Sequence, residues 1–435
     1  MKSTKSKSAS IIGRTMYIPR MSFSGAKLAS AAFQSIGIHA KPSPPSDAKT
    51  LELGSKYLNG DECLPERVTL GNFLKVIENP SFNPTETAFL LPTAGGPCRF
   101  GQYQGILKKI LKEKGYDQAM VVSPTSSDGY DGFGNAAEEL KRTFWHAIVV
   151  SDIIRKFHLK IRPYAVNKNL ANEIFHQSLD ELSEILATPG LKAKQRLHLL
   201  RNVLIKTKKR YHHIPAKFTK DKPLIGIVGE IYCRLNEFSN EYLINKIEEF
   251  GGEVWISDVA EWVWYTNDEQ KLRLIRAGKK FSRDMLVAKI KFAFQHKDEQ
   301  FLLQPFKQEF KGYEEPTHVH QILNYSRPYL PQEGALGEMV LNVGKAIFLH
   351  HKGADGIIDI SPFTCMNGIV CEVVYPQVSK DFDHLPIRIF YFDGSKLDLD
   401  RDVGIFLELA KSYMKKKKTE RVYPYYFNSA YTRIN

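Results

Sequence analysis

The chain has 435 residues, of which 43% are hydrophobic and 11% aromatic, and it carries a formal net charge of +13. This length exceeds what a single hydrophobic core serves, so two or three domains are expected. No apolar run approaches the length of a membrane-spanning helix, and five scattered cysteines do not form a disulfide framework, so we expect a cytoplasmic protein with reduced thiols.

Short apolar runs alternate with helical patterns in the first third of the chain, after a basic tail at residues 1–13 that we expect to be disordered. The predicted order is strand 15–19, helix 26–36, strand 38–40, helix 68–78, strand 87–91, a helix ending at 114 and strand 119–122. Alternation of this kind favours a parallel sheet with helices on both faces. We therefore predict a first α/β domain at residues 14–134.

The strand signal is absent from residues 135–221, where helical patterns dominate and predict a helical segment between or beside two domains. A second α/β domain is predicted at residues 222–410, with a helical insertion at 266–330, followed by a C-terminal tail at 411–435. Its expected strands are 224–228, 253–256, 357–360 and 387–391. The two halves repeat the same order of elements. The predicted fold class is α/β, with two Rossmann-like parallel-sheet domains in pseudo-repeat.

Three of the five cysteines, Cys63, Cys98 and Cys365, lie in loops that we expect to join a strand to a helix. Helix N-termini carry free amides and a partial positive charge that favour thiolates. Three thiolates converging at the carboxyl edges of two sheets could bind a metal centre and leave one coordination position open. The alternative for each is a small buried hydrophobic residue, an interpretation that fits Cys233 and Cys371 better.

Three further residues are candidates for the same site. Gly96, beside Cys98, would let backbone amides approach a bound group closely. Arg99 would add a positive charge next to it, or is an ordinary surface or phosphate-contacting arginine. Glu230 ends an apolar strand, where it is a candidate proton donor or the cap of the helix that follows.

Four motifs carry a resemblance to a known family. They are Glu62-Cys63-Leu64-Pro65 with residues 68–73, the run from Pro92 to Tyr103, the run from Val228 to Tyr232 with Asn236, Phe238 and Asn240, and Gly353-Ala354-Asp355-Gly356 with residues 361–366. Together they resemble the 2-hydroxyacyl-CoA dehydratase subunit superfamily over residues 14–409. The branch they resemble most is that of the acyl-CoA dehydratase activase-related proteins, kin to the double-cubane-cluster reductases.

The resemblance implies an iron–sulfur cluster, of 4Fe–4S or double-cubane type, held by Cys63, Cys98 and Cys365. It also implies an ATP-hydrolysing activase, with its own iron–sulfur cluster, that passes an electron at low potential. ATP would be used by that partner, since this sequence contains no Walker-type phosphate loop.

An assembly as a homodimer or with a related subunit is expected, acting on a small molecule or a CoA ester in an anaerobe or facultative anaerobe. No membrane partner is expected.

Two other classes of function remain open on the sequence. One is a non-catalytic electron carrier or cluster scaffold. The other is a nucleic-acid-binding protein, indicated by the net charge alone. The densest basic run, residues 415–418, closes a predicted helix, where cations suit the helix dipole. A nucleic-acid partner is therefore not expected.

Overall fold

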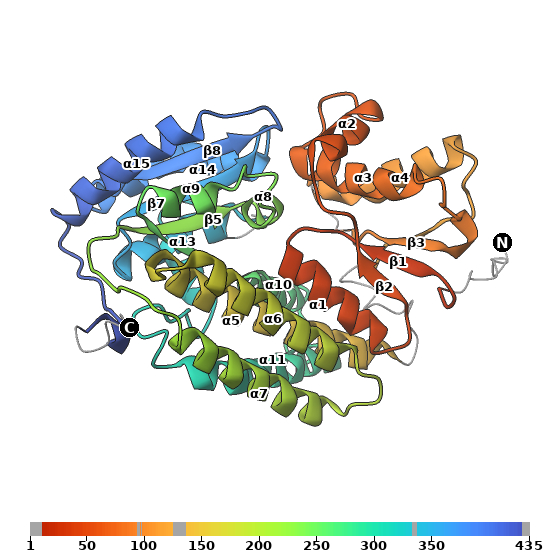
Figure 1. Cartoon of the computed structure of the whole chain (residues 1–435), viewed down its shortest axis with the longest axis horizontal. Helices are drawn as coiled ribbons and strands as arrows, with labels where there is room; N and C mark the ends of the chain where they lie inside the picture. The colour runs from red at the N-terminus through yellow and green to blue at the C-terminus, as the bar shows by residue number, and fades with distance from the viewer. Residues whose placement is uncertain (1–10, 94–95, 97, 125–135, 333–336, 429–435) are drawn as a thin grey trace. The chain divides into compact units, whose positions relative to one another are not determined.

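The computed structural model describes residues 11–93, 96, 98–124, 136–332 and 337–428. The chain forms two compact units, residues 1–147 with 183–193 and residues 148–182 with 194–435. Most of the predicted N-terminal tail and the last seven residues of the predicted C-terminal tail lie outside the described residues. Each unit has its own sheet, drawn in Figure 1 in red to orange for the first and green to blue for the second.

The first unit contains a four-stranded parallel sheet in the order β2-β1-β3-β4. Its strands are β1 (Thr15–Ile18), β2 (Ala40–Pro42), β3 (Thr87–Leu90) and β4 (Met120–Val122). Met16 lies opposite Ala40 on one side and Ala88 on the other, and Ala88 lies opposite Met120. All four strands predicted for this unit are therefore present, and they pair in parallel as predicted.

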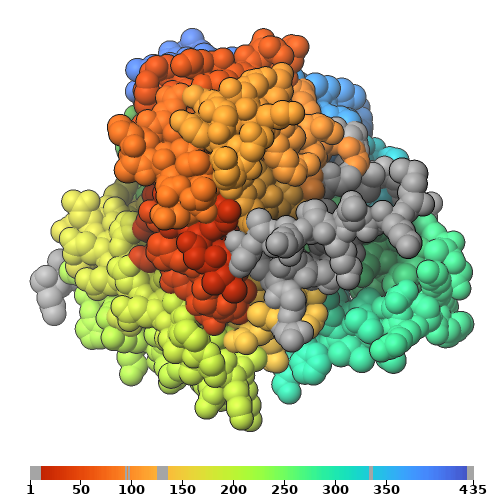
Figure 2. Space-filling model, turned by 90° about the vertical axis from the view of Figure 1, so that its right-hand side faces the viewer, coloured from red at the N-terminus to blue at the C-terminus, as the bar shows by residue number. Residues whose placement is uncertain are grey.

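Helices cover both faces of the first sheet. Successive side chains of a strand point to opposite faces, so each face forms a separate core with its own helices. The helices that pack on it are α1 (Phe23–Gln34), α2 (Ala48–Lys56), α3 (Leu64–Ile77), α4 (Tyr103–Glu113) and the start of α5 (Ala137–Ile161). Phe89 joins the core formed with α2, α3 and α4, whereas Ala88 and Leu90 join the core formed with α1 and α5. Figure 2 shows the outer surface of this unit, with the α2 to α4 segment in orange.

Helices α2 and α3 cross at very close range. A Cβ atom on Gly71 would lie 1.9 Å from the carbonyl oxygen of Thr50, and one on Gly54 would lie 2.2 Å from that of Arg67. Backbone atoms cannot rotate out of the way, so this crossing requires that both positions lack a side chain. The loop that ends at Cys63 connects these two closely packed helices.

The second unit contains a four-stranded parallel sheet in the order β6-β5-β7-β8. Its strands are β5 (Leu224–Gly229), β6 (Glu253–Ile256), β7 (Gly356–Pro362) and β8 (Ile387–Phe392). Ile227 lies opposite Ile256 on one side and Ile358 on the other. Counted along the chain, both sheets run second, first, third, fourth strand, which confirms the predicted pair of parallel sheets in pseudo-repeat.

Both faces of the second sheet are also covered, so β5 and β7 are buried along their whole lengths. The helices of this sheet are α8 (Ile231–Leu235), α9 (Leu243–Glu249), α13 (Met339–His351), α14 (Met366–Asp381) and α15 (Leu399–Met414). Helices α13 and α14 share one core with Leu224, Val228 and Ile357. Helix α15 packs on the other face, where Phe406 closes over Gly356.

The rest of the chain is largely helical. Its helices are α6 (Lys168–Ala187), α7 (Ala193–His212), α10 (Val259–Arg276), α11 (Arg283–Leu303) and α12 (His320–Ser326), with short 3-10 helices at Pro84–Glu86, Arg99–Gln102 (η2), Arg162–Tyr164, Gln304–Phe306 and Tyr425–Phe427. Helices α10, α11 and α12 occupy the chain between β6 and β7.

A buried ion-pair cluster in the second unit fixes the chain after α15. Glu253, at the start of β6, accepts a hydrogen bond from Lys160 at 2.9 Å and another from Arg421. The side chain of Glu253 is fully buried, and that of Arg421 is 4% exposed. A buried carboxylate needs such partners to offset the loss of water, so Arg421 ties the C-terminal segment to the sheet.

Candidate functional site

Cys63 is the residue that immediately precedes α3, with an extended backbone (φ −70°, ψ 155°). The prediction that this loop follows a strand is wrong, because α2 comes between the strand and the loop. A reciprocal cap starts α2: Asp47 accepts from the amide of Thr50 at 3.0 Å, and the Thr50 hydroxyl accepts from the amide of Asp47 at 3.1 Å. This is a capping box in which threonine replaces the usual Glu or Gln, which conceals the helix in the sequence.

Cys98 follows β3, as predicted, and immediately precedes η2, which continues into α4. Its backbone is extended (φ −69°, ψ 131°), and the residue is exposed. Gly96 has φ +108°, a conformation that favours glycine. Ala94, Gly95 and Pro97 of the same motif lie outside the described residues.

Two contacts bring the Cys63 loop and the Cys98 loop together within the first unit. The Arg99 guanidinium donates to the backbone carbonyl of Asp61. The hydroxyl of Tyr103, the first residue of α4, lies 2.8 Å from the Sγ atom of Cys63. The residue after Cys98 and the helix that follows it thus hold the loop that carries Cys63. Arg99 acts here as a positioning residue for that loop.

Glu66 is a functional candidate that the sequence interpretation missed. Its side chain is buried in the first turn of α3, and its Oε1 atom has no hydrogen-bond partner within the described part of the chain. Burial, aided by the charge of Glu62 and opposed by that of Arg99, raises the pKa of Glu66 to about 7. Buried polar atoms are normally paired, and an exception indicates an unseen ligand, water or catalytic role. The sequence signal is its spacing, three residues after Cys63, where a capping carboxylate is usual.

Cys365 occupies the corresponding position in the second unit. It follows β7, the third strand of its sheet, and immediately precedes α14, with φ −68° and ψ 122°. The preceding residue, Thr364, has φ +67°. A β-branched residue in this left-handed region is strained, and such strain is maintained mainly at ligand sites and switches.

The thiol of Cys365 is protonated at neutral pH. Burial, opposed by the amide of Gly368 and aided by the charge of Glu230, raises the pKa of Cys365 to about 12. The amides at the start of α14 favour the thiolate, as expected for a helix N-terminus, but the effect of burial on the pKa of Cys365 is larger. A bound metal would deprotonate such a thiol, since coordination stabilises the thiolate directly.

Carboxyl groups surround the start of α8 at the carboxyl end of β5. Glu230 accepts from the amides of Tyr232 and Cys233 at 3.0 and 2.8 Å, so it caps α8. Glu338 accepts from the amide of Ile231 at 2.8 Å. Burial raises the pKa of Glu230, and burial together with the charge of Glu230 raises that of Glu338 to about 8. Glu338 thus holds a proton at neutral pH, and each of the two carboxyl groups raises the pKa of the Cys365 thiol only when it is ionised.

The three candidate ligands are divided between the units: Cys63 and Cys98 belong to the first and Cys365 to the second. Among the residues that the structure describes, no group of three or more His, Cys, Asp and Glu side chains is placed to hold a metal ion. Cys233 and Cys371 are fully buried, in α8 and α14, which is the environment predicted for them.

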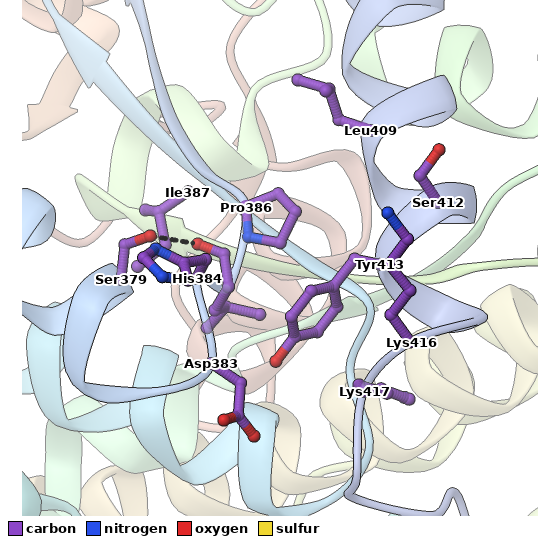
Figure 3. A pocket seen from close by; sticks show the side chains of 11 residues that line it. Ser379, Asp383, His384, Pro386, Ile387, Leu409, Ser412, Tyr413, Lys416 and Lys417 are labelled. Atoms are coloured by element: carbon purple, nitrogen blue, oxygen red, sulfur yellow. Dashed lines mark hydrogen bonds between the residues drawn. The ribbon is translucent and has the colours of Figure 1, made fainter.

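A separate pocket of about 500 Å³ lies in the second unit. Figure 3 shows its lining, with Tyr413 near the loop that carries Asp383 and the lysines that follow α15. Ile387, the first residue of β8, lines it, so the pocket is at the amino end of the strand. Cys365 follows the carboxyl end of the adjacent parallel strand, β7, and therefore lies at the opposite edge of the sheet.

No family model matches the chain, and no curated protein matches it. Within the residues described, no helix is long and apolar enough to cross a membrane.

Proposed function

We propose that Cys63, Cys98 and Cys365 hold an iron–sulfur cluster, and that the chain accepts low-potential electrons from an ATP-hydrolysing activase to reduce a small substrate. The observation that carries this proposal is the shared local geometry of the three cysteines. Each immediately precedes a helix, with φ between −68° and −70° and an extended ψ. Cys98 and Cys365 also follow the third strand of their respective sheets.

The chemistry of the donor set suits such a cluster. Cysteine thiolates are the usual ligands of iron–sulfur clusters, and these three are the cysteines that are not fully buried. The cluster would supply a one-electron centre of low potential with an iron site open to substrate, as the family resemblance implies. The orphaned Oε1 atom of Glu66, in the helix that follows Cys63, supports a ligand or a proton-transfer role at this place.

The chain's own residues would control protons and charge in this proposal. Glu66, with its pKa raised to about 7, would exchange a proton near neutral pH on the Cys63 side. Glu338, protonated at neutral pH, would supply one on the Cys365 side, next to Glu230, which caps α8. Arg99 would hold the Cys63 loop through the Asp61 carbonyl.

An apolar face beside Cys365 is the place we propose for the activase. Phe363, Met366, Ile369 and Val373 are between 42% and 76% exposed, and the last three lie on one side of α14 at helical spacing. Exposed contiguous apolar surface of this kind marks an interaction site. A partner docked there would sit close to the loop that carries Cys365.

The proposal is tested by measuring iron and sulfide in protein purified without oxygen. Cys98→Ala and Cys365→Ala should each lose most of the iron, whereas Cys233→Ala and Cys371→Ala should retain it. Cys98 is exposed, so its replacement should leave the fold intact and give the clearest result. Full iron and sulfide content in Cys98→Ala would refute the ligand assignment.

A second measurement separates an enzyme from an electron carrier. With the activase present, an enzyme should hydrolyse ATP only while substrate is being turned over. A carrier should show turnover only when a further electron acceptor is added.

A further inference from the structure

Helices α10 and α11 form a hairpin whose tip is held by a defined turn. The amide of Gly278 donates to Ile275 at 3.0 Å, and the amide of Lys279 donates to Leu274 at 2.8 Å. Ser282 caps α11 by accepting from the amide of Met285 at 3.2 Å. Between these caps, the side chain of Phe281 is 95% exposed. The tip therefore displays an exposed aromatic ring between two stretches of backbone that hydrogen bonds hold in place.

Helix α11 is apolar on two opposite sides. Its inner side carries the buried Met285 and Ala288, and Phe292, which packs on Trp264 at 4.9 Å between ring centroids. Its outer side carries four exposed apolar residues at the spacing of one helix face, namely Leu286 (58%), Val287 (57%), Ile290 (47%) and Phe294 (53%). A helix that is apolar on both sides is normally covered on both.

The tip of the hairpin and the helix turns next to it are strongly basic, although acidic residues in the rest of α10 and α11 reduce the net charge of residues 259–303 to +3. Residues 271–297 contain nine Lys or Arg and one Asp, a net charge of +8 in a chain whose total is +13. Eight of these cations are exposed, namely Arg273, Arg276, Lys279, Lys280, Arg283, Lys289, Lys291 and Lys297. Lys279 and Lys280 precede Phe281, whereas Lys289 and Lys291 flank Ile290.

The positive charge and the exposed apolar face of α11 together indicate what kind of partner binds here. A second copy packed face to face on residues 271–297 would bring two strongly positive segments into contact, which like-charge repulsion opposes. Nucleic acid would satisfy the charge and stack on the exposed phenylalanines, but it would leave Leu286, Val287 and Ile290 in contact with water, since bases stack on aromatic and guanidinium planes. An anionic bilayer satisfies both, because its headgroups attract lysines while its acyl boundary accepts apolar side chains.

We propose that residues 271–297 bind the surface of an anionic membrane, with Phe281 and the outer face of α11 inserted at the headgroup boundary. Lysine stems lie along the apolar stripe and place their ammonium groups among the headgroups. Such an attachment is peripheral and needs no membrane-spanning helix. It goes beyond the proposed redox function and does not depend on it.

Sedimentation of the full-length protein with lipid vesicles tests this proposal. Vesicles of phosphatidylglycerol mixed with phosphatidylcholine should bind the protein at least about tenfold more tightly than vesicles of phosphatidylcholine alone, and salt should weaken the binding. Phe281→Ser with Ile290→Ser should lower the affinity by about tenfold or more, since each removes an inserted apolar side chain. Lys279→Glu with Lys280→Glu should do the same.

Matched variants on α15 serve as controls. Ile405 and Leu409 are 52% and 55% exposed, so Ile405→Ser with Leu409→Ser removes similar apolar surface elsewhere. Lys415→Glu with Lys416→Glu reverses two cations in the densest basic run. Both control pairs should bind vesicles as the unaltered protein does.

Three outcomes would overturn the proposal. One is equal loss of binding in the α15 and hairpin variants, which would indicate attraction by net charge alone. Another is equal binding to both kinds of vesicle. The third is a dimer in solution that Ile290→Ser dissociates, which would make this face a contact between copies of the chain.

Discussion

The Tyr103 hydroxyl lies 2.8 Å from the Sγ atom of Cys63, although 40 residues separate them in the chain. Tyr103 begins α4, the helix entered through Cys98 and η2, so this contact links the two cysteine loops of the first unit. The Phe100 ring packs edge-on against Tyr103, with 5.4 Å between centroids, and holds it in this orientation.

Replacement of Tyr103 by Phe should lower the free energy of unfolding by about 1 kcal/mol, because one hydrogen bond to a half-buried thiol is lost. Iron content should stay near that of the unaltered protein, since the phenol is not a proposed ligand. Urea unfolding and iron analysis measure the two effects. Tyr242→Phe, at a half-exposed tyrosine, is the control and should leave both unchanged.

Glu66→Gln should stabilise the protein at pH 8 and have little effect at pH 4. The folded state raises the pKa of Glu66 from 4.5 to about 7, so the folded protein binds this proton more tightly than the unfolded chain does. The stability that this proton provides is present below pH 4.5 and is lost as pH rises through 7. Glutamine is neutral throughout, so the gain at pH 8 should be about 2 kcal/mol.

Urea unfolding of both proteins between pH 4 and pH 8 measures this difference. A stability difference that is the same at every pH would show that Glu66 does not titrate with a raised pKa.

Gly71→Ala should destabilise the protein by about 3 kcal/mol, since the new Cβ atom would meet the Thr50 carbonyl oxygen and force α2 away from α3. The displacement would also move the Cys63 loop, so iron content should fall. Gly105→Ala on α4 is the matched control, because open space surrounds that position. It should stabilise α4 by up to about 1 kcal/mol. Equal behaviour of the two variants in thermal unfolding would contradict the close crossing of α2 and α3.

Arg421→Met should destabilise the protein by about 3 kcal/mol, because it leaves the buried Glu253 with less positive charge around it. Burial alone would raise the pKa of Glu253, but the charges of Arg421 and Lys160 outweigh burial and lower this pKa to about 2. A lowered pKa gives stability that is present above pH 4.5 and lost as pH falls towards 2. The variant should therefore unfold in acid at a higher pH than the unaltered protein.

Acid titration followed by circular dichroism measures that midpoint. Arg401→Met removes an ion pair with Asp402 from a side chain that is 63% exposed, and it should change stability by less than about 0.5 kcal/mol. An unchanged acid midpoint in Arg421→Met would show that Arg421 does not hold the charge of Glu253.

The sequence by itself predicted the two parallel sheets. Strands that are buried on both faces appear in the sequence as continuous apolar runs, such as residues 224–228 and 357–360, and β5 and β7 are indeed buried along their whole lengths. It was also enough to place Cys98 and Cys365 after strands and before helices. The sequence interpretation missed helix α2, because the capping box at its start uses Asp47 and Thr50 in place of the usual residue pair.

Only the tertiary structure decided which loops meet and which groups hold protons. The contact of Tyr103 with Cys63, the burial of Glu66 and the raised pKa of Cys365 each depend on segments distant in the chain. The local pattern of apolar residues predicts which side of a helix or strand is buried. The pKa of a group depends instead on all the atoms and charges packed around it. For Cys365 these include Glu230, which follows another strand of the sheet.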